Sequence, residues 1–130
     1  DFFQFNSNTT RHTIDANVVY QGGQNFPMRL MVGTMVYGDD RSDSTGANRY
    51  STYMEAGYTI PLSSTQRIDL FVGGTPHQSF YNNQPGIVNI GFTAHQTTKI
   101  LRQQDLPVYV SFVVNPTNEN LFLVIGITLL

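Results

Sequence analysis

The chain of 130 residues contains no cysteine, which excludes a disulfide framework, a thiolate metal site and a cysteine nucleophile. Charged side chains are also scarce: they make up 12% of the sequence, about half of the roughly 25% in an average soluble domain. A soluble protein with so few charges is poorly protected against association, whereas a protein that exposes half of its strand residues to lipid needs no such protection. The formal net charge of −2 gives no basic footprint for nucleic acid.

Long apolar runs are missing as well. No stretch reaches the roughly 18 apolar residues of a membrane-spanning helix, and the longest, residues 121–130, is interrupted by Gly126 and Thr128. The first four residues, Asp1-Phe2-Phe3-Gln4, do not form the charged and apolar regions of a signal peptide. In an exported protein, such an N-terminus would be mature or truncated.

What the chain does contain is a strict alternation of apolar and polar residues. In residues 50–62 the even positions are almost all apolar, from Tyr50 through Met54 to Leu62, and the odd positions are mostly small or polar. A period of two places successive side chains on opposite faces of a sheet. No segment has a helical period, and the pattern predicts seven strands. They cover residues 12–21, 28–38, 50–62, 66–77, 87–101, 106–115 and 121–130.

The lengths of the strands and loops indicate a particular fold class. The strands have about the 9–11 residues that cross a bilayer obliquely. Short connections alternate with the longer loops 39–49 and 78–86, as tight periplasmic turns alternate with larger outer loops in outer-membrane barrels. We therefore predict an all-β fold, a transmembrane antiparallel up-and-down β-barrel in a Gram-negative outer membrane. Its C-terminus would lie on the periplasmic side, and its surroundings would be outer-membrane lipids and lipopolysaccharide.

Seven is an awkward number of strands for such a barrel. Bacterial single-chain barrels close with an even number of strands. An open edge in lipid would leave unpaired backbone groups that cost several kcal/mol each. We therefore expect residues 1–130 to form the C-terminal portion of one outer-membrane β-barrel domain whose N-terminal strands are missing.

The polar face of the predicted strands supplies the candidate site residues. The predicted lumen-facing residues are Asp15, Arg29, Glu55, Arg67, Asp69, Asn89, His95 and Tyr109. The opposite orientation would expose charge to lipid, at about 2–4 kcal/mol for an arginine at the midplane. Arg67 and Asp69 lie on one face, where neighbours can pair. Two interpretations remain open: a salt-bridge network that holds the strands, or a pore-lining selectivity element.

The same alternation is compatible with a soluble lipocalin-like barrel or sandwich whose apolar face points inward. Against this alternative, the polar face is rich in glycine, serine, threonine and asparagine rather than lysine and glutamate, and most charges lie in loops.

Catalytic and metal motifs are weak. His12, His77 and His95 are widely spaced and have no cysteine partner, so we expect no metal and no cofactor. The acidic loop near Asp40 lacks the ligand spacing of an EF-hand and is expected to be solvated. Ser51, His77 and Asp69 could supply a Ser-His-Asp set, but their spacing does not select them and no G-x-S-x-G motif occurs. The chain is therefore not expected to be an enzyme.

Several short motifs resemble one protein family along nearly the whole chain. The motifs are Tyr50-Ser51-Thr52-Tyr53-Met54-Glu55-Ala56-Gly57-Tyr58, Phe26-Pro27-Met28-Arg29-Leu30, Gly73-Gly74-Thr75-Pro76, Leu106-Pro107-Val108 and Leu121-Phe122-Leu123-Val124-Ile125-Gly126-Ile127. They resemble the C-terminal part of porin-like outer-membrane proteins of Bacteroidota. The resemblance implies a full barrel of roughly twelve strands and carries no catalytic motif. The terminal Leu129-Leu130 differs from the aromatic residue at which many such barrels end.

Two functions follow from these observations. The polar inner face favours a porin-like passive channel for small solutes. Bulky inner residues such as Met31, Met35, Phe71 and Phe122 favour instead a structural or partner-binding barrel, a subunit of a larger outer-membrane complex with other outer-membrane proteins and no open pore.

Overall fold

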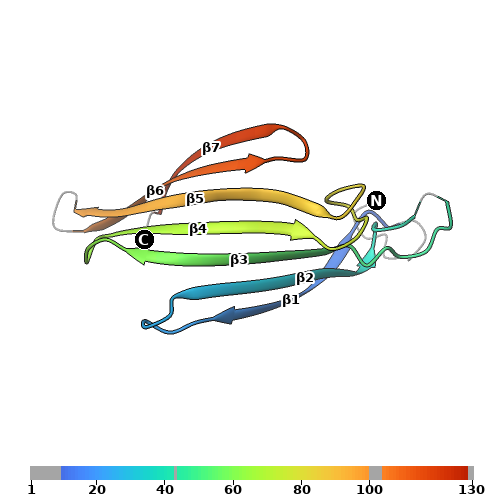
Figure 1. Cartoon of the computed structure of the whole chain (residues 1–130), viewed down its shortest axis with the longest axis horizontal. Coiled ribbons are helices and arrows are strands. Elements are labelled where there is room, and N and C mark those ends of the chain that lie inside the picture. The colour runs from blue at the N-terminus through green and yellow to red at the C-terminus, as the bar shows by residue number, and fades with distance from the viewer. Residues whose placement is uncertain (1–9, 43, 100–103, 129–130) are drawn as a thin grey trace.

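The computed structural model describes residues 10–42, 44–99 and 104–128. They form a single sheet of seven antiparallel strands in which neighbours in sequence are neighbours in space (Figure 1). The strands are β1 (Thr13–Gln21), β2 (Met28–Gly38), β3 (Thr52–Pro61), β4 (Gln66–Thr75), β5 (Gly86–Lys99), β6 (Asp105–Asn115) and β7 (Asn120–Ile127). The described ranges contain no helix, and hence none with the length and apolarity to span a membrane.

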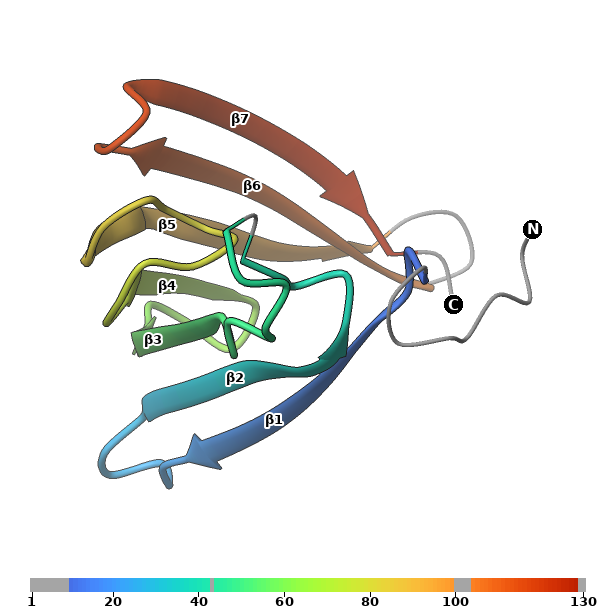
Figure 2. The same cartoon turned by 90° about the vertical axis from the view of Figure 1, so that its right-hand side faces the viewer.

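The sheet is strongly curved, so that the seven strands form an open trough (Figure 2). Strands β1 and β7 are its edges, and each pairs with one neighbour only. The prediction of an all-β, antiparallel, up-and-down arrangement is therefore confirmed, whereas the sheet is not closed into a barrel.

The observed strand ends agree closely with the predicted ones. The main difference is the start of β3, which begins at Thr52 rather than at Tyr50. Tyr50 has a φ of 53°, a left-handed conformation in which extended backbone cannot continue. Strand β4 ends at Thr75, two residues before the predicted end at residue 77. Strand β7 ends at Ile127, since Thr128 lies outside it, and so stops before the predicted end at residue 130. The predicted end at residue 101 lies outside the described residues.

One unbroken apolar row runs across the whole sheet. The directly paired residues in this row, from β1 to β7, are Tyr20, Leu30, Ala56, Val72, Ile90, Val114 and Leu121. The side chains at both ends of the row are well exposed, 58% for Tyr20 and 62% for Leu121. We call the side of the sheet that carries this row the apolar face, and the opposite side the polar face. The two faces predicted from the alternation are therefore present in the structure.

Val88 departs from the predicted alternation. We expected it on the apolar face, but the register between β4 and β5 shifts at Gly73 and Gly74, so that Val88 is an extra residue between two pairs. A β-bulge of this kind turns a side chain out of the regular alternation. Val88 is consequently only 3% exposed, and Ile87 is exposed instead.

Aromatic rings on the polar face lie along the wall of the trough. A Cβ atom added at Gly73 would overlap the ring of Tyr53, and one added at Gly126 would overlap the ring of Tyr109. At Gly91 the added Cβ would lie 3.0 Å from Cζ of Phe71. Each ring therefore occupies the space that a side chain on the next strand would fill, and does not project into the trough.

Gly91 also permits a close approach of backbones, and this generates a prediction. A methyl group at Gly91 would overlap the backbone carbonyl oxygen of Phe112 on β6. We expect Gly91→Ala to lower the free energy of unfolding by about 1–3 kcal/mol, the usual effect of overpacking. Urea unfolding followed by far-UV circular dichroism measures the change. The control is Gly23→Ala, since an added Cβ there meets nothing within 4 Å; equal midpoints for the two variants would contradict the prediction.

Candidate functional site

All eight predicted lumen-facing residues lie on the polar face, as the strand registers require. The first cluster contains Arg29, Glu55 and Asn89, the second contains Arg67, Asp69, His95 and Tyr109, and Asp15 belongs to neither. The polar face thus gathers seven of the eight residues into two groups.

The first cluster is centred on the carboxylate of Glu55. Arg29 Nη1 donates to Glu55 Oε1 at 2.6 Å, and the hydroxyl of Tyr53 donates to Oε2 at 2.9 Å. Asn89 Nδ2 donates to the hydroxyl of Tyr53 at 3.3 Å. The chain of contacts spans β2, β3 and β5. Tyr53 is absent from the predicted set, although the alternation places it on the correct face.

The second cluster is centred on the carboxylate of Asp69. Oδ1 accepts a hydrogen bond from Thr59 Oγ1 at 2.7 Å, and Oδ2 contacts His95 Nε2 at 2.8 Å and Arg67 Nε at 3.3 Å. When His95 Nε2 carries the proton, Nδ1 is free to accept from Arg67 Nη2 at 3.4 Å. The ring of Tyr109 lies 6.0 Å from that of His95. The predicted pairing of Arg67 with Asp69 is confirmed.

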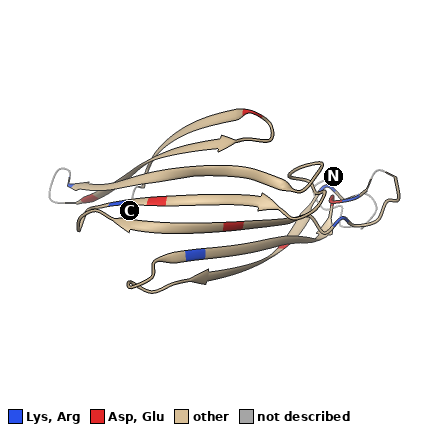
Figure 3. Cartoon of the chain, viewed as in Figure 1, with Lys and Arg blue, Asp and Glu red and all other residues tan. Residues whose placement is uncertain are grey.

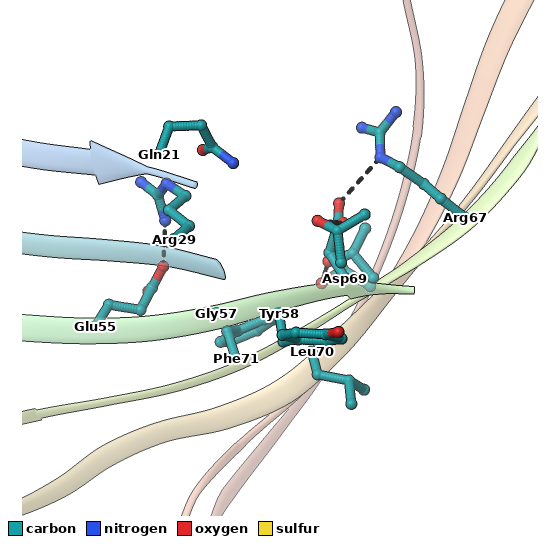
Figure 4. A pocket seen from close by; sticks show the side chains of 12 residues that line it. Gln21, Arg29, Glu55, Gly57, Tyr58, Arg67, Asp69, Leu70 and Phe71 are labelled. Atoms are coloured by element: carbon teal, nitrogen blue, oxygen red, sulfur yellow. Dashed lines mark hydrogen bonds and ion pairs between the residues drawn. The ribbon is translucent and has the colours of Figure 1, made fainter. Parts of the chain in front are cut away.

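A cavity of about 580 Å³ lies between the two clusters. Figure 4 shows Gln21, Arg29 and Glu55 on one side of it and Arg67 with Asp69 on the other. The lining residues are Gln21, Arg29, Glu55, Gly57, Tyr58, Thr59, Arg67, Asp69, Leu70, Phe71, Thr93 and Ser111. Its volume falls in the range of small-molecule sites, roughly 300–1,000 Å³.

Few charges lie along the strands, and most of the others gather near the strand ends (Figure 3). The charged side chains that line the cavity are two arginines and two carboxylates, Arg29, Arg67, Glu55 and Asp69. They carry no net charge, and each arginine is held by a carboxylate.

A further set of polar groups, separate from the two clusters, is buried where the loops leave the sheet. The carboxylate of Asp40 accepts hydrogen bonds from Ser51 N at 2.7 Å and from Ser51 Oγ at 2.6 Å. Phe80 N donates to Ser51 Oγ at 2.7 Å, which ties the loop after β2 to the loop after β4. We call these three residues the loop latch. Asp40 is 2% exposed, so the expectation that this loop is solvated was wrong at Asp40.

Tyr81 extends the loop latch toward the first cluster. Its ring centroid lies 5.5 Å from that of Tyr53 and 6.1 Å from that of Phe80. Burial raises the pKa of Tyr81, and the negative charges of Asp15 and Asp40 raise it further. The loop after β4 is therefore folded toward the polar face.

The considered set of Ser51, His77 and Asp69 is not assembled. Ser51 bonds to Asp40 and Phe80, whereas Asp69 bonds to Thr59 at the other end of β3. Thr59 follows Ser51 by eight residues, about 26 Å along an extended strand. Among the described residues, no group of three His, Cys, Asp or Glu side chains could hold a metal ion.

No protein-family model, curated protein or solved structure matches the chain. The functional conclusion therefore depends on the geometry of the sheet and its cavity.

The loop latch supplies a prediction about stability. Ser51→Ala removes a donor to Asp40 and the acceptor for Phe80 N in a site with no exposure, so we expect a loss of about 1–3 kcal/mol in the free energy of unfolding. Urea unfolding measures the loss, and limited proteolysis should show faster cleavage in the two latched loops. Ser63→Ala is the matched control, because the Ser63 hydroxyl is exposed and contacts only the backbone N and the hydroxyl of Thr65 among the described residues. If both variants unfold at the same urea concentration, the latch contributes nothing to stability.

Proposed function

We propose that this sheet is part of a transmembrane β-barrel of a Gram-negative outer membrane, and that its polar face lines a passive channel for small solutes. The observation that carries the proposal is the apolar row that crosses all seven strands from Tyr20 to Leu121, of which all but Ala56 and Val114 are exposed. Monomeric soluble proteins rarely expose a continuous apolar surface of this extent. Lipid is the medium in which such a surface is stable, while polar groups face a lumen.

Exposed aromatic side chains at both ends of the strands support this orientation. Tyr20, Phe26 and Tyr58 lie near the short turns. Phe26 packs edge-on against Tyr58, with the two ring centroids 6.4 Å apart. Tyr50 and Phe80 lie at the loop end and are 57% and 68% exposed. The exposed aromatic side chains thus lie at both ends of the strands, as they do in outer-membrane barrels, where two aromatic girdles flank the apolar band.

The open edges indicate how the barrel would close. With seven antiparallel strands, β1 and β7 run in the same direction. Antiparallel closure therefore needs an odd number of additional strands between them. Five additional strands would give the roughly twelve that the resemblance to porin-like proteins of Bacteroidota implies.

The shape of the polar face favours a channel over a filled structural barrel. The rings of Tyr53, Phe71 and Tyr109 lie along the wall over glycines, and a cavity remains between the ion-pair clusters. One observation favours the second candidate, a structural or partner-binding subunit: the loop after β4 folds toward the polar face and packs Tyr81 on Tyr53.

The membrane orientation can be tested with single cysteines, since this chain has none of its own. In the full-length protein reconstituted in vesicles, a fluorophore on Phe112→Cys should be quenched by nitroxides on lipid acyl chains, because Phe112 lies on the apolar face. A fluorophore on Ser111→Cys should be quenched by aqueous iodide instead. If neither label responds to the lipid nitroxide, or if the protein stays outside the vesicles, the sheet does not face lipid.

The channel itself can be tested in planar bilayers. The full-length protein should produce stepwise conductance, and Glu55→Gln should shift its reversal potential toward anion selectivity, because Arg29 loses its counter-charge in the lumen. The control is Glu119→Gln, at an exposed residue in the turn before β7. A silent bilayer would favour the structural subunit, and an equal shift in both variants would rule out the lumen position of Glu55.

A further inference from the structure

The cavity on the polar face has a balanced charge. Arg29 is bonded to Glu55 and Arg67 to Asp69, and the remaining polar lining consists of an amide and hydroxyl groups. At either ion pair, an anion or cation that enters this cavity would meet an opposite charge that is already paired, with a like charge beside it. Neutral solutes avoid this repulsion.

The ion pairs keep hydrogen-bonding capacity toward the cavity. The side chains of Arg29 and Glu55 are 39% and 18% exposed, and those of Arg67 and Asp69 are 53% and 31% exposed. A guanidinium group only donates and a carboxylate only accepts, whereas a hydroxyl group does both. Two adjacent hydroxyls of a solute can therefore accept from the arginine and donate to the carboxylate of the same pair. The hydroxyls of Thr93 and Ser111, 2.9 Å apart, offer a third position.

Phe71 gives the cavity an apolar wall. Its neighbours on the polar face are Gly57 on β3 and Gly91 on β5, so no side chain stands beside it in the paired positions. Its ring lies along the wall over Gly91. An aromatic ring placed between hydrogen-bonding groups is complementary to a sugar, whose ring presents C–H groups on its face and hydroxyls at its edge.

We infer that this cavity binds a neutral polyhydroxylated solute, a monosaccharide or a small oligosaccharide, as the solute passes through the barrel. The inference rests on the proposed channel and names its solute class. The site comprises Gln21, the Arg29–Glu55 pair, the Arg67–Asp69 pair and Phe71, on four neighbouring strands.

The test uses the full-length protein in a planar bilayer, with glucose and sucrose as probes. Each sugar should reduce the ion current with a saturating dose response, and polyethylene glycol of similar mass should not saturate. A current that no sugar blocks overturns the sugar site and leaves the channel standing. Stronger block by glucuronate or by glycine also overturns it, since the site would then select an anion or a zwitterion.

A silent bilayer overturns the channel rather than the site. In that case, titration calorimetry with sucrose on the protein folded in detergent decides the matter. Saturable heat supports the sugar site, and its absence overturns it.

Variants locate the contact. Phe71→Ala should raise the half-blocking sugar concentration about tenfold, and Phe71→Tyr should leave it nearly unchanged because the ring is kept. Phe122→Ala is the matched control, as Phe122 also lies on the polar face but does not line the cavity. Gln21→Ala, at an exposed position at the end of an edge strand, should raise that concentration about threefold without disturbing the sheet. Equal effects of Phe71→Ala and Phe122→Ala, or no effect of Gln21→Ala, overturn the assignment.

Discussion

Every other feature of this protein depends on the register of the backbone hydrogen bonds between the strands. A slip of one residue in any ladder would move all side chains of that strand to the other face. In each of the six strand pairs from β1 to β7, the residues that lie directly opposite each other point to the same face of the sheet. This alone produces one apolar and one polar face. The two register shifts, at Ile14/Asp15 and Gly73/Gly74, both lie near the loop end of the sheet. They alter the faces only there, where Val88 turns inward, and leave the central rows intact.

The register also explains why the charged residues meet. Arg29 lies directly opposite Gly57, which has no side chain, so its guanidinium extends diagonally to Glu55. Asp69 lies opposite both Thr59 and Thr93, and it bonds to Thr59 and to the diagonal neighbour His95. Isolated pairs of this kind contribute little at a water-exposed surface, about 0–1 kcal/mol. Their larger effect is to neutralise four charges within one cavity.

The strands and their faces were predictable because period-two alternation is a local property of the sequence. The proximity of Arg67 and Asp69 was predictable for the same reason, since residues two apart share a face. The loop latch was not predictable, because Asp40, Ser51 and Phe80 meet only after the sheet has aligned two loops, and no periodic signal links them. Val88 was misplaced for a related reason: a bulge depends on the partner strand, here on the glycine pair Gly73 and Gly74 of β4.

The two edges of the sheet, β1 and β7, differ from its middle in how exposed their apolar side chains are. All nine residues of β1 are exposed on both faces, and apolar side chains are exposed even on the polar face at the edges: Val19 at 51%, Phe122 at 51% and Val124 at 45%. In the middle of the sheet the polar face carries the charged residues Arg29, Glu55, Arg67 and Asp69, hydroxyl groups and the ring of Phe71. Apolar residues at both margins of a polar surface are stable if further strands pair there and cover them. The same strands would satisfy the free backbone groups of β1 and β7, which lipid cannot do. In the proposed barrel, closure and burial of these margins are therefore one requirement, and meeting it would also give the cavity its remaining wall.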